Sequence, residues 1–209
     1  MSRKIEKVKG KKSLIIKRTN KYAFSAIVIT LLSFYSFTPD NNNKLDMLAN
    51  DYIENYSEIA IIEMYRTGVP ASITLAQALH ETNYGQSKLA IEANNHFGIK
   101  CKSYWSGESY YHKDDDFDKN GNLINSCFRK YNIVMFSYID HSNFLREGKH
   151  YASLFEYDKT DFESWAYGLK RCGYATDPNY AEKLIAKIKK YDLYKYDYSS
   201  NPMAIGGGN

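Results

Sequence analysis

A glutamate at the end of an apolar helical segment is the residue of this chain best suited to acid catalysis. Residues 70–85 predict a short helix with an apolar middle, as in a helix buried in a core, and Gly85 ends it. Ser72 is a candidate N-cap, and Gln77 lies one turn before Glu81 on the same face. The negative end of a helix and apolar surroundings both favour the protonated form of Glu81, as a general acid requires. A solvated glutamate that merely ends a helix fits this segment equally well.

A run of aspartates could supply a second catalytic group, because most glycosidases pair their acid with another carboxyl across the sugar. The aspartates of this run are Asp114, Asp115, Asp116 and Asp118. They precede Asn120-Gly121, the strongest short signal for a β-hairpin. Their spacing also matches the first half of an EF-hand calcium loop, although Cys127 stands where its bidentate glutamate belongs. The run can therefore be a catalytic carboxylate, a calcium site or a solvated turn.

Aromatic residues are abundant, with twenty tyrosines and two tryptophans in 209 residues. Most of them are expected in the core, but aromatic faces also suit the apolar faces of sugar rings. Five lie in expected loops or at element ends and are candidates for sugar contact: Tyr84, Phe97, Trp105, Tyr110 and Tyr174.

The elements that would position these residues are mostly helical. Apolar periodicity predicts helices over 45–67, 72–83, 86–92, 133–146, 160–173 and 177–191, the first interrupted near 55–57. Residues 99–131 are rich in aromatic and turn residues and predict a small antiparallel hairpin lobe. The sequence thus indicates an α+β domain of two unequal lobes, with a cleft between them where ligand sites are common.

The N-terminal segment differs from the rest of the chain. Residues 1–39 contain nine basic and one acidic residue, and residues 22–37 are uncharged and apolar, which indicates an export signal or a retained membrane anchor. The remaining residues, with 19 basic and 23 acidic side chains, carry a net charge of −4. Because no basic patch is evident there, nucleic acid is not an expected partner. Residues 40–46 are expected to be a polar linker, and residues 196–209 a flexible tail.

The three cysteines allow two interpretations. In an oxidising compartment Cys101 and Cys127 could form a disulfide, which would leave Cys172 free. Alternatively, all three are free thiols. Their spacing does not suggest zinc.

Five motifs, taken in order, resemble the signature of the glucosaminidase family, glycoside hydrolase family 73. They are Ala76-Gln-Ala-Leu-His-Glu-Thr-Asn-Tyr-Gly85, Asn94-Asn-His-Phe-Gly-Ile-Lys100, Trp105-Ser-Gly107, Phe128-Arg-Lys-Tyr131 and Gly173-Tyr-Ala-Thr-Asp-Pro-Asn-Tyr180. Together they extend over about residues 47–195, so their order is far more specific than any single motif.

This resemblance implies a lysozyme-like fold and assigns roles to individual residues. Glu81 matches the general acid of the family, and Asp116 matches its second carboxylate, with Asp115 or Asp114 as alternatives. Tyr174 matches a tyrosine placed near the cleaved sugar. The substrate-binding candidates within or beside the motifs are Gln77, Tyr84, Asn95, Phe97 and Trp105.

The sequence and the resemblance together predict an exported endo-β-N-acetylglucosaminidase that acts on peptidoglycan in the periplasm, the cell envelope or the medium. It is expected to be a monomer whose residues 47–195 form the catalytic domain, and to use water without a metal or other cofactor. A muramidase or lytic transglycosylase on the same scaffold is an alternative. A wall-binding module without activity is another.

Overall fold

The computed structural model describes residues 41–206, except for the side chains of residues 41, 114–116, 205 and 206. The apolar segment 22–37, predicted as an export signal or anchor, lies outside the described residues. Within residues 41–206, no helix is both long enough and apolar enough to cross a membrane.

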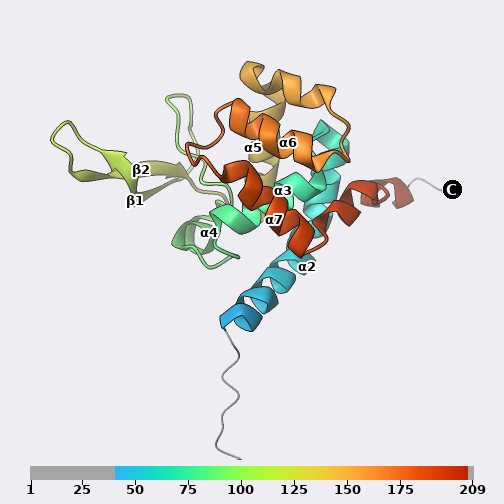
Figure 1. Ribbon diagram of the computed structural model, residues 1–209. Helices are drawn as coiled ribbons and strands as arrows, with labels where there is room; N and C mark the ends of the chain where they lie inside the picture. The colour runs from blue at the N-terminus through green and yellow to red at the C-terminus, as the bar shows by residue number, and fades with distance from the viewer. Residues whose placement is uncertain (1–40, 207–209) are drawn as a thin grey trace, which may run out of the picture. The chain divides into compact units, whose positions relative to one another are not determined.

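The described chain is mostly helical and has one small antiparallel sheet, as the sequence predicts (Figure 1). The α-helices are α2 (Asn41–Thr67), α3 (Ala71–Glu81), α4 (Lys88–Ala93), α5 (Val134–Glu147), α6 (Phe162–Arg171) and α7 (Tyr180–Lys190). Short 3₁₀ helices are η1 (Lys149–Glu156), η2 (Leu193–Tyr198) and η3 (Pro202–Gly206). Strands β1 (Ser109–Phe117) and β2 (Leu123–Arg129) form the hairpin.

Helix α3 lies at the centre of the helical body, and its residues 71–79 are all buried. Ser72 does not cap it, contrary to the prediction, because the helix already begins at Ala71. Its N-terminus is instead capped from η2, where the buried Asp197 Oδ1 accepts a hydrogen bond of 2.8 Å from the Ser72 amide. The expectation of a flexible tail from residue 196 is therefore wrong for its first residues, since a carboxylate there completes the core helix.

Helix α2 also corrects two expectations. It begins at Asn41, so residues 41–46, expected to be a linker, form its first turns. It is continuous through residues 55–57, where an interruption was expected. The Asn55 side chain donates to the Asp51 carbonyl one turn earlier, while Ile53 and Ala60 of the same helix are buried in the core. Packing of the apolar face thus prevails over the local preference of Asn55 for turns.

The hairpin forms where Asn120-Gly121 predicts it. Its pairing is regular from Ser109 opposite Arg129 to Lys113 opposite Asn125, and the register shifts before the pair of Phe117 and Leu123. In the turn, Asp118 Oδ1 accepts hydrogen bonds from the backbone amides of Asn120 and Asn122 at 2.8 and 2.9 Å. These bonds lower the pKa of Asp118, that from Asn122 most. The Asp118 carboxylate therefore organises the turn, which favours the hairpin interpretation over a calcium loop.

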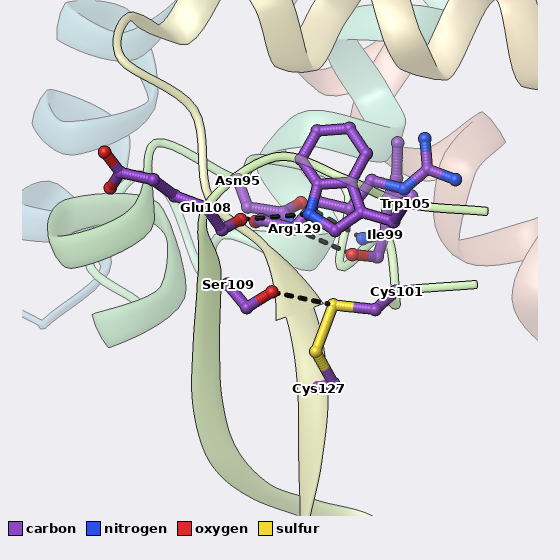
Figure 2. Close-up of a disulfide and its surroundings, with 8 residues drawn as sticks. All are labelled: Asn95, Ile99, Cys101, Trp105, Glu108, Ser109, Cys127 and Arg129. Carbon is purple, nitrogen blue, oxygen red and sulfur yellow. Dashed lines mark hydrogen bonds between the residues drawn. A yellow bond between two sulfur atoms is a disulfide. The ribbon is translucent and has the colours of Figure 1, made fainter. Parts of the chain in front are cut away.

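A disulfide between Cys101 and Cys127 ties the segment before the hairpin to β2, which confirms the first of the two cysteine interpretations (Figure 2). The Cys101 amide donates to the Cys127 carbonyl at 2.8 Å, and the Ser109 hydroxyl lies 3.6 Å from Cys101 Sγ. Cys172 is a free, half-buried thiol. The disulfide thus fixes the base of the hairpin to the loop that leads into it.

Replacing both disulfide cysteines by serine is expected to lower the free energy of unfolding by about 3 kcal/mol, because the 26-residue separation leaves an unrestrained loop in the unfolded chain. Urea denaturation followed by circular dichroism measures this loss. Cys172→Ser is the control, and dithiothreitol should lower the stability of the wild type but not that of the double variant. Equal stability of the wild type and the double variant would contradict this prediction.

Candidate active site

A cleft of about 670 Å³ lies between the helical body and the hairpin, and Glu81 is one of its lining residues. The end of α3, the loop 97–104, both strands, α5 and the segment after α6 all contribute to its walls. Of the residues predicted from the sequence, this cleft brings together Glu81, Phe97 and Tyr174.

Glu81 is the last residue of α3, and its side chain is exposed although the preceding helix is buried. The carboxyl is thus open to solvent in the free protein, although aromatic side chains such as Phe97 and Tyr174 line the same cleft. The chain turns away directly after it, because Asn83, Tyr84 and Gly85 have positive φ values of 49°, 60° and 80°. The Thr82 hydroxyl stabilises this turn by accepting from the Gly85 amide at 2.7 Å. A rigid helix end thus presents the carboxylate to the cleft.

Tyr174 is held beside Glu81 by the way in which α6 ends. Gly173, at φ 76°, lets the chain reverse, and the Tyr174 amide donates to the Leu169 carbonyl at 3.1 Å. The Tyr174 ring stacks on Tyr180 with 5.6 Å between centroids. Burial raises the pKa of the Tyr174 hydroxyl well above its ordinary range, and the nearby Tyr180 and Glu81 raise it further. Tyr174 is therefore a neutral phenol close to the Glu81 carboxylate.

Gln77 and Asn95 support the cleft from within and do not line it. Gln77 is fully buried, and its Nε2 donates to the hydroxyl of Tyr180 at 3.0 Å, which holds the partner on which Tyr174 stacks. Asn95 is 1% exposed and donates to the carbonyls of Ile99 and Arg129 at 2.9 and 2.8 Å. Both were predicted to bind substrate, but in this structure they position other residues of the cleft.

His141 is a cleft residue that was not singled out from the sequence. Its ring stacks on Phe97 at 3.9 Å between centroids, nearly parallel, and lies edge-on to Tyr174 at 6.2 Å. Burial lowers the pKa of His141 to about 3, so the imidazole is neutral. Its spacing from Tyr138 and Leu145 on α5 was a usable signal, because residues three and four apart share a helix face.

Two other predicted residues line different hollows. Tyr84 faces a hollow of about 350 Å³ beside α2, and Trp105 faces one of about 440 Å³ beside α5. Trp105 lies close against its own loop, since a Cβ on Gly107 would lie 2.3 Å from the indole. This contact explains the glycine of the Trp-x-Gly motif. Tyr104, the neighbour of Trp105, lines the cleft that contains Glu81.

The second carboxylate stays a prediction, because the side chains of residues 114–116 lie outside the described part of the chain. Their backbone belongs to β1, where the strand register shifts between Lys113 and Phe117. Such irregularities redirect side chains relative to a regular strand and are common beside active sites.

The sequence model of the glucosaminidase family, described as mannosyl-glycoprotein endo-β-N-acetylglucosaminidase, matches residues 57–193. The chain belongs to this family. Among curated relatives of this glucosaminidase domain, the exo-glucosaminidase LytG of Bacillus subtilis is 36% identical over 152 residues, which cover 70% of this chain and 52% of LytG. The peptidoglycan hydrolase FlgJ of Vibrio parahaemolyticus is 32% identical, with 77% and 52% covered. The chain thus spans about half the length of these relatives.

Solved structures confirm the lysozyme-like α+β fold expected for the glucosaminidase domain. The catalytic domain of the autolysin Auto from Listeria monocytogenes superposes with a TM-score of 0.65 at 26% identity, covering 82% of this chain and 96% of that one. The glycoside hydrolase domain of FlgJ from Salmonella typhimurium gives a TM-score of 0.58 at 27% identity, with 75% and 96% covered.

Proposed function

We propose that this protein is a peptidoglycan hydrolase that cleaves the β-1,4 bond following N-acetylglucosamine. The observation that carries the proposal is the position of Glu81 at the rigid end of α3, in a cleft large enough for sugar rings and beside the neutral phenol of Tyr174. The family and the names of its relatives support the substrate class.

In the proposed mechanism, Glu81 donates its proton to the oxygen of the glycosidic bond as the bond from C1 to that oxygen breaks. Water supplies the hydroxyl that ends on C1, and its remaining proton returns to Glu81 or to the solvent. The Tyr174 hydroxyl, neutral because of its burial, is a hydrogen-bond donor beside the reacting sugar. No metal or other cofactor takes part in these steps.

A carboxylate from β1, or the acetamido group of the substrate itself, would stabilise the opposite face of the sugar. The shifted register between Lys113 and Phe117 supports a role for this segment. Asp116→Asn is expected to lower kcat by about 10²-fold, measured as the release of reducing sugar from purified peptidoglycan. Asp115→Asn and Asp114→Asn are the matched comparisons. If the loss follows one of them instead, the second role moves to that residue, and if all three variants stay fully active, the acetamido group acts alone.

We propose an endo mode of cleavage, and a time course of product length tests it. The cleft has contributions from both lobes and is about 670 Å³, which supports binding along a strand. The family is described as an endo-β-N-acetylglucosaminidase, whereas LytG is named an exo-glucosaminidase, so relatives of both modes are known. An endo enzyme shortens long glycan strands early and yields small fragments late. Disaccharides as the first products, while the long strands persist, would contradict the endo mode.

We also propose that the protein acts outside the cytoplasm, where peptidoglycan lies. The basic and apolar composition of residues 1–39 supports export, and the names of the relatives agree with it. A muramidase or lytic transglycosylase would leave a different sugar at the new end of the strand. A wall-binding module would bind peptidoglycan and release no sugar.

A further inference from the structure

Tyr104 is a prominently exposed aromatic residue of the cleft. Its side chain is 75% exposed, although it lines the same cleft as Glu81. An exposed side chain is usually free to change its rotamer. The hydroxyl of Tyr104, however, accepts a hydrogen bond from Arg129 Nη2 at 3.2 Å. The centre of the Arg129 guanidinium also lies 5.4 Å from the ring centroid. The ring is therefore both open to a ligand and held in place.

Arg129 is itself fixed, because it joins the hairpin to the helical body. Its side chain is 8% exposed, and Nη1 donates to both carboxylate oxygens of Asp140 on α5, at 2.9 and 2.7 Å. Its backbone amide donates to the Ile99 carbonyl at 3.0 Å, and its carbonyl accepts from Asn95 Nδ2 at 2.8 Å (Figure 2). Tyr131 donates its hydroxyl to the same Asp140 carboxylate. The guanidinium thus cannot shift without breaking contacts between the two lobes.

Trp105 also contacts Arg129, but its indole lines a different hollow from the one that contains Glu81. The Arg129 guanidinium lies 4.7 Å from a Trp105 ring centroid, and the indole Nε1 donates to the Glu108 carbonyl at 3.0 Å (Figure 2). These contacts and the close approach of Gly107 hold the indole within its loop, facing the hollow beside α5. Of the two adjacent aromatic rings, Tyr104 is therefore the one that lines the cleft.

We propose that Tyr104 is the residue of the hairpin side on which a sugar ring of the glycan strand stacks, and that Arg129 is the positioning residue that holds it. The proposal rests on the proposed function, because it names a contact of the same substrate. A ring restrained by a guanidinium loses little rotamer freedom on binding, so more of the stacking energy appears as affinity. Because Tyr104 acts by its face and the guanidinium still lies against the ring, phenylalanine should retain most of the binding, although it loses the hydrogen bond from Arg129.

The test measures affinity in a Glu81→Gln background, so that bound glycan is not cleaved. The probe is soluble glycan of alternating N-acetylglucosamine and N-acetylmuramic acid, released from peptidoglycan by an amidase and titrated by calorimetry. Adding Tyr104→Ala is expected to weaken binding about tenfold, whereas Tyr104→Phe should stay within about threefold. The matched control is Tyr111→Ala, since Tyr111 of β1 is 65% exposed but is not part of the cleft lining.

The positioning role has its own readout. Arg129→Lys retains the charge but loses the planar fork, so it should weaken glycan binding by about fivefold. Because the guanidinium also lies against Trp105, the indole should become more accessible in this variant, and acrylamide quenching of tryptophan fluorescence should rise. Trp105 provides most of the quenchable signal, since the other tryptophan, Trp165, is 1% exposed. In Tyr104→Ala the additional change Arg129→Lys should cost little further affinity.

Unchanged affinity in Tyr104→Ala would overturn the stacking proposal, as would an equal loss in Tyr111→Ala. Loss of affinity in Arg129→Lys that persists fully in the Tyr104→Ala background would overturn the positioning role. Both outcomes are distinct from failure of the proposed function, in which Glu81→Gln binds no glycan and the wild type releases no sugar.

Discussion

Replacing Glu81 by glutamine is expected to lower the rate of glycan cleavage by about 10³-fold or more, because the amide has no acidic proton for the leaving oxygen. Stability should change little, since the side chain is exposed at the end of α3 and glutamine has nearly the same shape. Release of reducing ends from purified peptidoglycan measures the rate, and thermal unfolding measures the stability.

The matched control for this change is Glu58→Gln, which alters an exposed glutamate of α2 away from the cleft. It should retain wild-type activity. Substantial cleavage by Glu81→Gln would show that Glu81 is not the general acid. A variant that has lost both activity and thermal stability would instead give Glu81 a structural role.

The second large effect is a loss of stability in acid. Burial lowers the pKa of His96 to about 4 and that of His141 to about 3, so both rings must stay neutral in the folded state. The unfolded chain takes up these protons near pH 6.5. Stability from both histidines is therefore full above that pH and is lost as the pH falls, by about 5 kcal/mol between pH 7 and pH 4.5.

Asp197 opposes this trend. Burial raises the pKa of its carboxyl to about 6. As the pH falls, Asp197 therefore takes up its proton at a higher pH in the folded state than in the unfolded chain. The contribution of Asp197 to the free energy of unfolding is full below about pH 4 and is lost as the pH rises through 6. Between pH 7 and pH 4.5 it therefore raises the stability by about 2 kcal/mol. The expected net loss between pH 7 and pH 4.5 is about 3 kcal/mol, measured by urea denaturation at each pH.

His141→Phe isolates one of the contributions. Neither ring nitrogen of His141 has a hydrogen-bond partner in the described part of the chain, and phenylalanine can retain the stacking on Phe97. In this variant, the loss of unfolding free energy that the two histidines cause between pH 7 and pH 4.5 should be about half as large. His150→Gln, at an exposed position, is the control. Acid sensitivity identical to that of the wild type in His141→Phe would contradict the assignment.

Features encoded locally could be predicted from the sequence. Asn120-Gly121 forms its turn with the help of Asp118, two residues earlier. Asp161 begins α6 because its side chain accepts from the Ser164 amide at 3.0 Å. Glu81 was identified because the apolar spacing and the glycine stop around it lie within sixteen residues. Such signals need only neighbouring residues to act.

Features that depend on distant residues could not be predicted in this way. The cap of α3 comes from Asp197, 125 residues after Ser72, and no local pattern connects them. Gln77 was placed on the face of Glu81, but its partner Tyr180 lies 103 residues further on. Trp105 was predicted to face the substrate, whereas Arg129 and Gly107 hold it facing another hollow. In each case tertiary contacts decide which way a side chain points.

The sugar at the newly formed reducing end distinguishes cleavage after N-acetylglucosamine from cleavage of the other glycosidic bond. Purified peptidoglycan would be digested by the wild type and by Glu81→Gln, reduced with borohydride and analysed by mass spectrometry. We expect reduced N-acetylglucosamine at the new ends in the wild-type digest and almost none with the variant. An increase in reduced N-acetylmuramic acid, or in its anhydro form, over undigested peptidoglycan would contradict this expectation.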